Sequence, residues 1–304
     1  MDKIQNYIEK RSRELGIAHP TIEDLNRCVK EWMQMVNTQT SDDFDGYSPS
    51  EMQSILYHLF DVNCPVRLAD FTGEDCQSVP LFRQVKMLLR MIEKEDRLKL
   101  TQTGNLPVRI VKELYSEGAT EQHVENGIVK LHIEKDSISV QLARIIVEIM
   151  KAVKKQGNKF SLTKRGKELL ADDCKLLTEL LNVVFLHFNL AYFDRYLSEN
   201  IGVLGIGFSL ILLNKYGDID QSDNFYAEKY FKAFPKLLLE TGGGAFTPQS
   251  REATNCYFHR VFNILFYHLG FVEITETDYF TSVYKRTIHR TAIIEKLFKI
   301  SHPN

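Results

Sequence analysis

The stretches LKLTQTG (residues 98–104) and FSLTKRG (residues 160–166) share one pattern and decide the fold class of this chain. In both, a few residues that alternate between apolar and polar are followed by Leu-Thr-x-x-Gly or a close variant of it. Alternation with a period of two favours a short strand, and threonine followed by glycine favours a turn or a helix start. We therefore predict short strands at residues 98–101 and 160–163, each directly preceding a helix.

The segments before these two stretches have helical periodicity. Apolar residues recur every three or four positions, which predicts amphipathic helices. A weaker third copy has a helix ending at Gly270, two alternating segments (271–275 and 281–287) and a closing helix over 288–300. The two clear stripes are Leu81, Phe82, Val85, Leu88, Leu89 and Ile92, and then Ile138, Leu142, Ile145, Ile146, Ile149 and Val153.

This repeated order of helices and short strands predicts a mainly α-helical protein with short β-hairpins. We expect tandem helix-plus-hairpin units around a central helical core. The polar stretch between residues 38 and 50 is the best candidate for a linker. The expected domains are an N-terminal helical hairpin (1–40), a first unit (48–135), a second unit with an aromatic helical core (136–240) and a C-terminal helix-hairpin-helix unit (241–304).

The stretch LTKRGKELL (residues 162–170) resembles the junction between wing strand and helix in winged helix-turn-helix regulators of the MarR and PadR type. The stretch from Leu100 to Pro107 is similar to repeated units in uncharacterised bacterial proteins. The resemblance implies winged-helix-like units, in which Thr163 caps a helix and Gly166 lets that helix start against the strand. Winged-helix domains also serve as protein-contact modules, so the resemblance leaves DNA binding and protein binding both open.

Composition limits the function classes. The 304 residues carry 38 Lys and Arg against 40 Asp and Glu, a net charge of −2, so nucleic-acid binding would need a local basic patch. The five cysteines form no C-x-x-C pair, which indicates reduced thiols in a cytoplasmic protein. The opening residues do not resemble a signal peptide, and the longest apolar run (201–213) is too short to cross a bilayer, so we expect no membrane span.

A basic segment runs from Lys151 to Lys167 without an acidic residue. Phosphate contacts supply most of the affinity of a winged helix for DNA, so such a cluster is a candidate interface. If the second unit binds duplex DNA, Lys155, Lys159, Lys164 and Arg165 should lie on one exposed face around the wing; the alternative is a solvated surface at helix ends. The candidate residues are Lys154, Lys155, Lys159, Lys164, Arg165 and Lys167, joined in the third unit by Lys285, Arg286 and Arg290.

The segment from residue 185 to 196 mixes aromatic and ionisable side chains. It predicts either an aromatic core with a polar edge or an apolar ligand pocket, and a His187–Asp194 pair could act in acid–base chemistry if the fold joined them. The candidate pocket residues are Phe185, His187, Phe188, Tyr192 and Asp194.

We predict no metal site and no cofactor. In DDFDG (residues 42–46) a calcium loop would place Met52 where a bidentate Glu belongs. His58, Cys64 and Cys76 have no standard zinc spacing and no fourth ligand. The favoured function is therefore non-enzymatic binding or scaffolding, with protein or nucleic acid as the partner; an enzyme or a binder of a small apolar ligand is the remaining alternative.

Overall fold

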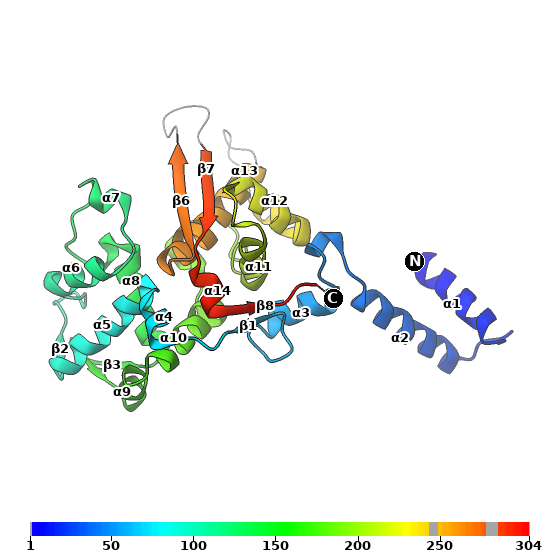
Figure 1. The fold of residues 1–304 in the computed structure, drawn as a ribbon, viewed down its shortest axis with the longest axis horizontal. Coiled ribbons are helices and arrows are strands. Elements are labelled where there is room, and N and C mark those ends of the chain that lie inside the picture. Colours follow the sequence, from blue (N-terminus) through cyan, green and yellow to red (C-terminus); the bar gives the residue numbers. More distant parts are fainter. Residues whose placement is uncertain (1, 243–248, 278–284, 304) are drawn as a thin grey trace.

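The computed structural model describes residues 2–242, 249–277 and 285–303, and within them the chain is mainly helical with three small antiparallel sheets (Figure 1). The predicted fold class is confirmed at this level. Within the described residues, no helix is both long and apolar enough to cross a membrane.

The first two helices form an arm that projects away from the rest of the molecule (Figure 1). They are α1 (Asp2–Glu14) and α2 (Ile22–Thr38). Thr21 and Asp24 form a capping box at the start of α2. We call residues 2–38 the arm. The next elements are η1 (Asp42–Phe44), α3 (Pro49–Tyr57), β1 (Val66–Leu68) and α4 (Gly73–Gln77).

Residues 80–162 fold around one three-stranded sheet. In it β2 pairs with β4, and β4 pairs with β3. The elements are α5 (Pro80–Lys94), β2 (Leu98–Lys99), α6 (Val108–Glu117), α7 (Gln122–Glu125), η2 (Glu134–Asp136), α8 (Ile138–Ile149), β3 (Val153–Gln156) and β4 (Lys159–Leu162).

Both predicted strands exist, although residues 100–107 separate β2 from the helix α6, and β2 pairs with β4. The expected boundary between residues 135 and 136 would put these neighbouring strands in different units. Leu98 lies directly opposite Phe160, and both are buried. The two stretches share a pattern because they line one face of one sheet.

The helix after β4 starts against the sheet. The Thr163 side chain accepts a hydrogen bond from the Gly166 amide and caps α9 (Lys164–Leu170). A Cβ on Gly166 would lie 2.0 Å from the Ala152 carbonyl oxygen, so any side chain there would clash with the backbone. The roles expected for this threonine and this glycine are confirmed.

The chain then builds the aromatic core. The helix α10 (Asp173–Asn182) runs into a π-helical turn, η3 (Val183–His187), and a short 3₁₀ turn, η4 (Leu190–Phe193). The later elements are α11 (Ile206–Tyr216), β5 (Gln221–Ser222), α12 (Asp223–Ala233), η5 (Pro235–Glu240), α13 (Gln249–Tyr257), the π-helix η6 (Phe258–Phe266), β6 (Val272–Thr277), β7 (Lys285–Arg290), α14 (Ile293–Leu297) and β8 (Phe298–Ile300).

The predicted closing helix over 288–300 is wrong except for the five residues of α14. Ile288 belongs to β7 and pairs with Ile274 of β6, while β8 pairs with β1. The Phe298 ring packs against Phe60 and Phe271, so tertiary contacts override the helical periodicity of the segment. The expected third hairpin exists as β6 and β7, but its turn falls partly on residues 278–284, outside the described part.

A buried ion pair lies inside the aromatic core. The Arg260 guanidinium on η6 donates to both Asp194 carboxylate oxygens, at 2.7 and 2.8 Å, and to the Ile201 carbonyl oxygen at 2.8 Å. The Arg260 side chain is fully buried and that of Asp194 is 6% exposed. The pair fixes the irregular segment between η4 and α11 onto the π-helix.

Candidate nucleic-acid interface

The outer face of the sheet formed by β2, β4 and β3 carries three lysines. Lys99 lies directly opposite Lys159, and Lys154 lies opposite Ser161, two residues further along β4. All three lysines are exposed, and no ion pair involves any of them within the described residues. Like charges directly opposite each other destabilise a sheet, so this face is arranged at a cost to folding.

Lys155 does not share that face. It pairs across the hairpin with Phe160, which is fully buried, so its side chain leaves the sheet on the side of α8. Its ammonium would lie 3.2 Å from a Cβ built on Gly104. The expectation that Lys155 and Lys159 lie on one face is therefore wrong, because neighbouring register positions alternate between the two faces of the sheet.

The cations of α9 extend the basic surface beyond the hairpin. Lys164 and Lys167 are exposed, and Lys164 lies 4.0 Å from Glu168. Arg165 is half-exposed and forms an ion pair with Glu179 of α10. Within the predicted cluster, the ion pair makes Arg165 less accessible to an anion than four of the lysines, which are Lys154, Lys159, Lys164 and Lys167.

The cluster predicted near the C-terminus serves the fold. The Arg286 guanidinium bonds to Asp223 and Asn255 and lies over the Phe258 ring. Arg290 pairs with Asp218 and Glu295, both at 2.6 Å, and its side chain is 10% exposed. Of these three residues, Lys285 is the exposed one. One exposed lysine does not make a second basic patch in this part of the protein.

The solvent-facing side of α8 has little free positive charge. Its outward residues are Gln141, Arg144, Ile145, Glu148 and Ile149. Arg144 pairs with Glu134 and with Glu148, donates to the Gly104 carbonyl oxygen at 2.9 Å, and lies over the Phe160 ring. It joins α8 to the loop after β2, to η2 and to β4, so its charge is neutralised inside the module.

A groove of about 580 Å³ runs beside this helix. Ile145 and Ile149 of α8 line it together with Gly104, Lys155 and Tyr192. Tyr192 is 59% exposed and comes from η4, which the sequence places more than 40 residues after α8. The periodicity of the sequence does not predict that Tyr192 lies beside α8, because this proximity depends on the path of the chain after α10.

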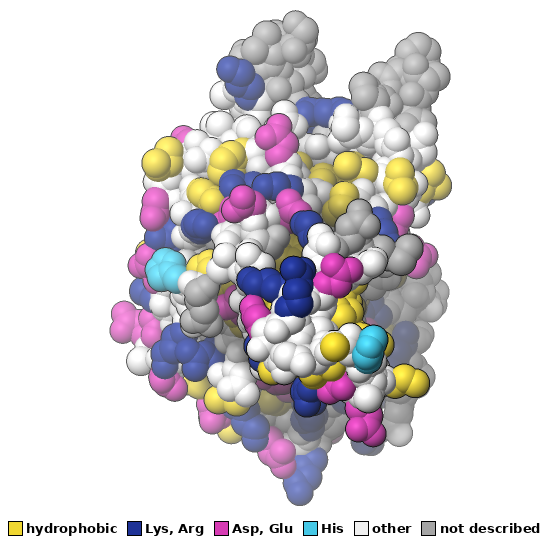
Figure 2. All heavy atoms as spheres, turned by 90° about the vertical axis from the view of Figure 1, so that its right-hand side faces the viewer, with side chains coloured by type: hydrophobic (Ala, Val, Ile, Leu, Met, Phe, Trp, Pro, Cys, Tyr) yellow, Lys and Arg dark blue, Asp and Glu magenta, His cyan; other side chains and the backbone are white. Residues whose placement is uncertain are grey.

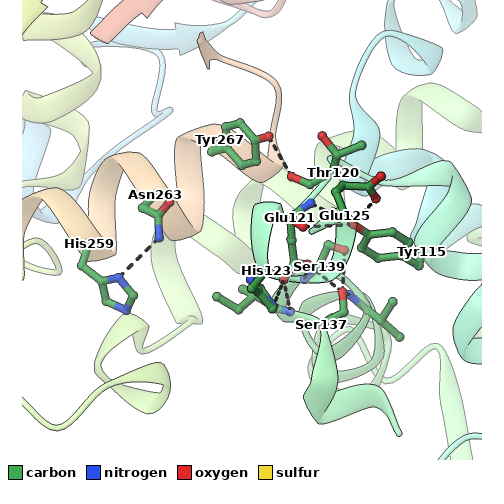
Figure 3. A network of polar contacts seen from close by, with 12 residues as sticks. Tyr115, Thr120, Glu121, His123, Glu125, Ser137, Ser139, His259, Asn263 and Tyr267 are labelled. Atoms are coloured by element: carbon green, nitrogen blue, oxygen red, sulfur yellow. Dashed lines mark hydrogen bonds and ion pairs between the residues drawn. The ribbon is translucent and has the colours of Figure 1, made fainter. Parts of the chain in front are cut away.

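A buried carboxylate positions the start of α8 (Figure 3). The Glu121 carboxylate accepts hydrogen bonds from the Ser137 hydroxyl at 2.6 Å and from the Ile138 and Ser139 amides at 3.0 Å. It thereby satisfies amides that a helix leaves unpaired at its N-terminus. The His123 ring lies 3.3 Å from the same carboxylate.

The C-terminal part of the chain reaches this network (Figure 3). The Tyr267 hydroxyl donates to the Thr120 carbonyl oxygen at 2.8 Å. The neighbouring His268 is 2% exposed, and its Nδ1 atom has no hydrogen-bond partner among the described residues. Burial lowers the pKa of His268 to about 4, although the Glu121 charge acts in the opposite direction.

Because of His268, we expect the folded protein to lose stability in mild acid. The neutral ring is favoured in the folded state, so its contribution is complete above the unfolded pKa near 6.5 and is lost as the pH falls toward 4. Between pH 7.5 and pH 5 we expect about 2 kcal/mol of loss from this group. The change His268→Phe should reduce the difference in urea unfolding free energy between these pH values. His187→Phe, at an exposed position, is the matched control and should leave the difference intact; equal effects of both changes would contradict the prediction.

The structure gives the predicted pocket residues different surroundings. Phe185 packs in the core against Phe60, Phe266 and Phe298. His187 is exposed, whereas the Asp194 carboxylate is bound to Arg260. The predicted acid–base pair is therefore not assembled, and the alternative of an aromatic core with a polar edge describes the segment.

The acidic stretch after the arm also has a structural role. Asp45 accepts from Lys215 at 2.7 Å, Lys229 at 2.9 Å and the Tyr216 hydroxyl at 2.9 Å, which fastens the expected linker to α11 and α12. No group of three or more His, Cys, Asp or Glu side chains in the described ranges is arranged to hold a metal ion.

Comparison with known proteins places one resemblance on this region. A family model described as the Y4jL N-terminal domain matches residues 77–175. The match spans about a third of the chain, from the end of α4 into α10, and so contains the whole three-stranded sheet with its helices. Neither the curated proteins nor the solved structures include a match to the chain.

Proposed function

We propose that residues 80–162 form a single winged helix-turn-helix module in place of the two units expected from the repeated pattern. In this assignment α6 and α8 are the helices of the helix-turn-helix, and the β3–β4 hairpin is the wing. The order of helices and strands supports it, as does a sheet in which the strand after the first helix pairs with the second strand of the hairpin. The turn between α6 and α8 is enlarged by α7.

We further propose that the chain is a non-enzymatic binding protein that holds nucleic acid by its phosphate backbone. The observation that carries this proposal is the juxtaposition of Lys99 and Lys159, with Lys154 beside them, which no ion pair among the described residues relieves. A phosphate bound near these ammonium groups would reduce the electrostatic repulsion between the lysines in the folded protein. Lys164 and Lys167 lie close in sequence to the wing and could follow the same backbone.

The mode of binding follows from α8. In helix-turn-helix proteins the second helix reads base edges in the major groove. Here its one cation, Arg144, is committed to Glu134 and Glu148, and its exposed face presents Ile145 and Ile149. We therefore propose contact with the backbone and little discrimination between sequences.

The double variant Lys99→Ala/Lys159→Ala tests this function. It should weaken binding to mixed-sequence duplex at low salt and reduce the slope of log affinity against log salt by about 2, roughly one for each phosphate that the variant no longer neutralises. The melting temperature should stay level or rise slightly, because a like-charge pair is removed. A fluorescence-anisotropy titration over a salt series measures the slope.

The matched control removes two exposed lysines elsewhere, Lys30→Ala/Lys236→Ala, and has the same net charge. It should bind like the unaltered protein. Absence of binding at low ionic strength, where electrostatic association is strongest, would reject the proposal, as would an equal loss in the control.

A protein partner is the second candidate function. The observation that favours it is the groove beside α8, where Ile145, Ile149 and Tyr192 are solvent-accessible among polar and charged lining residues. If the salt titration shows no nucleic-acid binding, this groove becomes the site to test, with Ile149→Glu as the variant that should abolish partner capture.

A further inference from the structure

We propose that the arm is a dimerisation element, and that its occupant is the arm of a second copy of this chain. The inference is independent of nucleic-acid binding. It concerns the part of the molecule farthest from the three-stranded sheet (Figure 1).

Much of the arm lies away from the body of the protein, which α2 reaches through its contact with α3. The cluster of buried apolar residues that forms the core begins at Tyr47 and includes no residue of the arm among those described. In α2, Cys28 is the buried residue. Figure 2, which views the molecule from the side of the arm, shows hydrophobic side chains open to solvent among charged ones.

Five apolar residues of α2 have the spacing of a helix-pairing seam. Ile22, Leu25, Val29, Trp32 and Val36 follow one another at intervals of three, four, three and four residues. Ile22 is 77% and Leu25 37% exposed, and the other three are half-buried. Helices with such a seam gain stability when a second helix covers it.

The helix α1 contacts a different flank of α2. The Arg11 guanidinium donates to Glu31 at 2.9 Å, and the Tyr7 hydroxyl donates to the same carboxylate at 3.4 Å. Cys28, three residues before Glu31, is buried on this flank. The two helices therefore contact each other through Cys28 and Glu31, while Ile22 and Leu25 of the seam stay exposed to a second partner.

The charge pattern selects a second copy. Besides Cys28, which is buried on the side of α1, the positions that flank the seam are Asn26, Met33 and Met35, and none of them is charged. Two identical faces can approach about a two-fold axis without like-charge repulsion, and a charged partner would find no counter-charge there. Met33 and Met35 are 52% and 47% exposed and can adapt to a symmetric contact.

The size of the face is sufficient for a dimer of modest affinity. The 17 residues of α2 span about 25 Å. Two antiparallel hairpins packed as a four-helix bundle would bury on the order of 1,000 Å² in total, close to the lower limit of specific interfaces.

Light scattering coupled to size exclusion tests the proposal on the full chain. At tens of micromolar the protein should have about twice its 35.2 kDa chain mass and dissociate on dilution. The variant Ile22→Glu/Met33→Glu should be monomeric at the same concentration with an unchanged melting temperature, because both side chains are exposed in the monomer.

The matched control is Val62→Glu/Ile219→Glu, which places the same charges at positions on the body that are 78% and 71% exposed. It should remain dimeric. A monomeric unaltered protein would overturn the proposal, and so would a dimer that survives in the arm variant or is lost equally in the control.

Discussion

Replacing Asp194 with alanine is expected to lower the free energy of unfolding by about 3–5 kcal/mol, because it leaves the buried Arg260 guanidinium without its counter-charge. The guanidinium cannot lose its proton to escape the cost. Its remaining bond to the Ile201 carbonyl oxygen does not neutralise it. Urea denaturation at neutral pH measures the loss.

The matched control is Asp70→Ala. Asp70 also pairs with a cation, Lys299 at 2.7 Å, but its side chain is 98% exposed. Exposed pairs contribute little to stability, so this change should have little effect. Similar losses in the two variants would show that the Asp194–Arg260 pair does not behave as a buried ion pair.

Replacing Arg144 with methionine should cost a comparable amount, about 3–5 kcal/mol, for the converse reason. The Glu134 side chain is 4% exposed and would keep a charge without Arg144 beside it, although the Leu106 amide still donates to it at 2.7 Å. The loop after β2 and the start of β4 would both lose an anchor.

A second substitution separates lost charge from lost packing. Glu134→Gln removes the buried charge and keeps an acceptor for the Leu106 amide, so Arg144→Met/Glu134→Gln should recover much of the stability. No recovery in the double variant would contradict the argument. Nucleic-acid affinity of the folded single variant should be unchanged, because the Arg144 charge is not available to a phosphate.

In residues 80–162 the sequence predicted the individual strands and helix starts better than it predicted which strands pair with each other. Strands at 98–99 and 159–162, the Thr163 cap and the close approach at Gly166 follow from short-range pattern and turn chemistry. Strand pairing is a contact between distant segments, and two similar strands can belong to two units or to one sheet. For that reason Lys99, which pairing places opposite Lys159, was missing from the predicted cluster.

The remaining errors arise where tertiary contacts determine a residue's role. A run of basic residues gives the charge of a segment but not the face of each side chain, so Lys155 was grouped with Lys159. Arg286 and Arg290 have the same sequence signature as free cations, yet acidic groups far along the chain neutralise them. Likewise, Asp194 and His187 were close enough in sequence to suggest a pair, but Arg260 binds the carboxylate.

The pairing of β1 with β8 has a consequence for biosynthesis. Val66 lies opposite Ile300, so a strand made early in translation finds its partner only when nearly the whole described chain has left the ribosome. Contacts between segments so far apart are slow to form, because a large loop must close first. Within the described chain, the strands of the sheet in residues 80–162 pair only with one another, so this sheet can form before the rest of the chain is made. The Phe60 ring packs on Phe298, so this contact forms only near the end of synthesis. Until then the nascent core exposes apolar surface, and this interval is when the chain is most prone to aggregate or to need a chaperone.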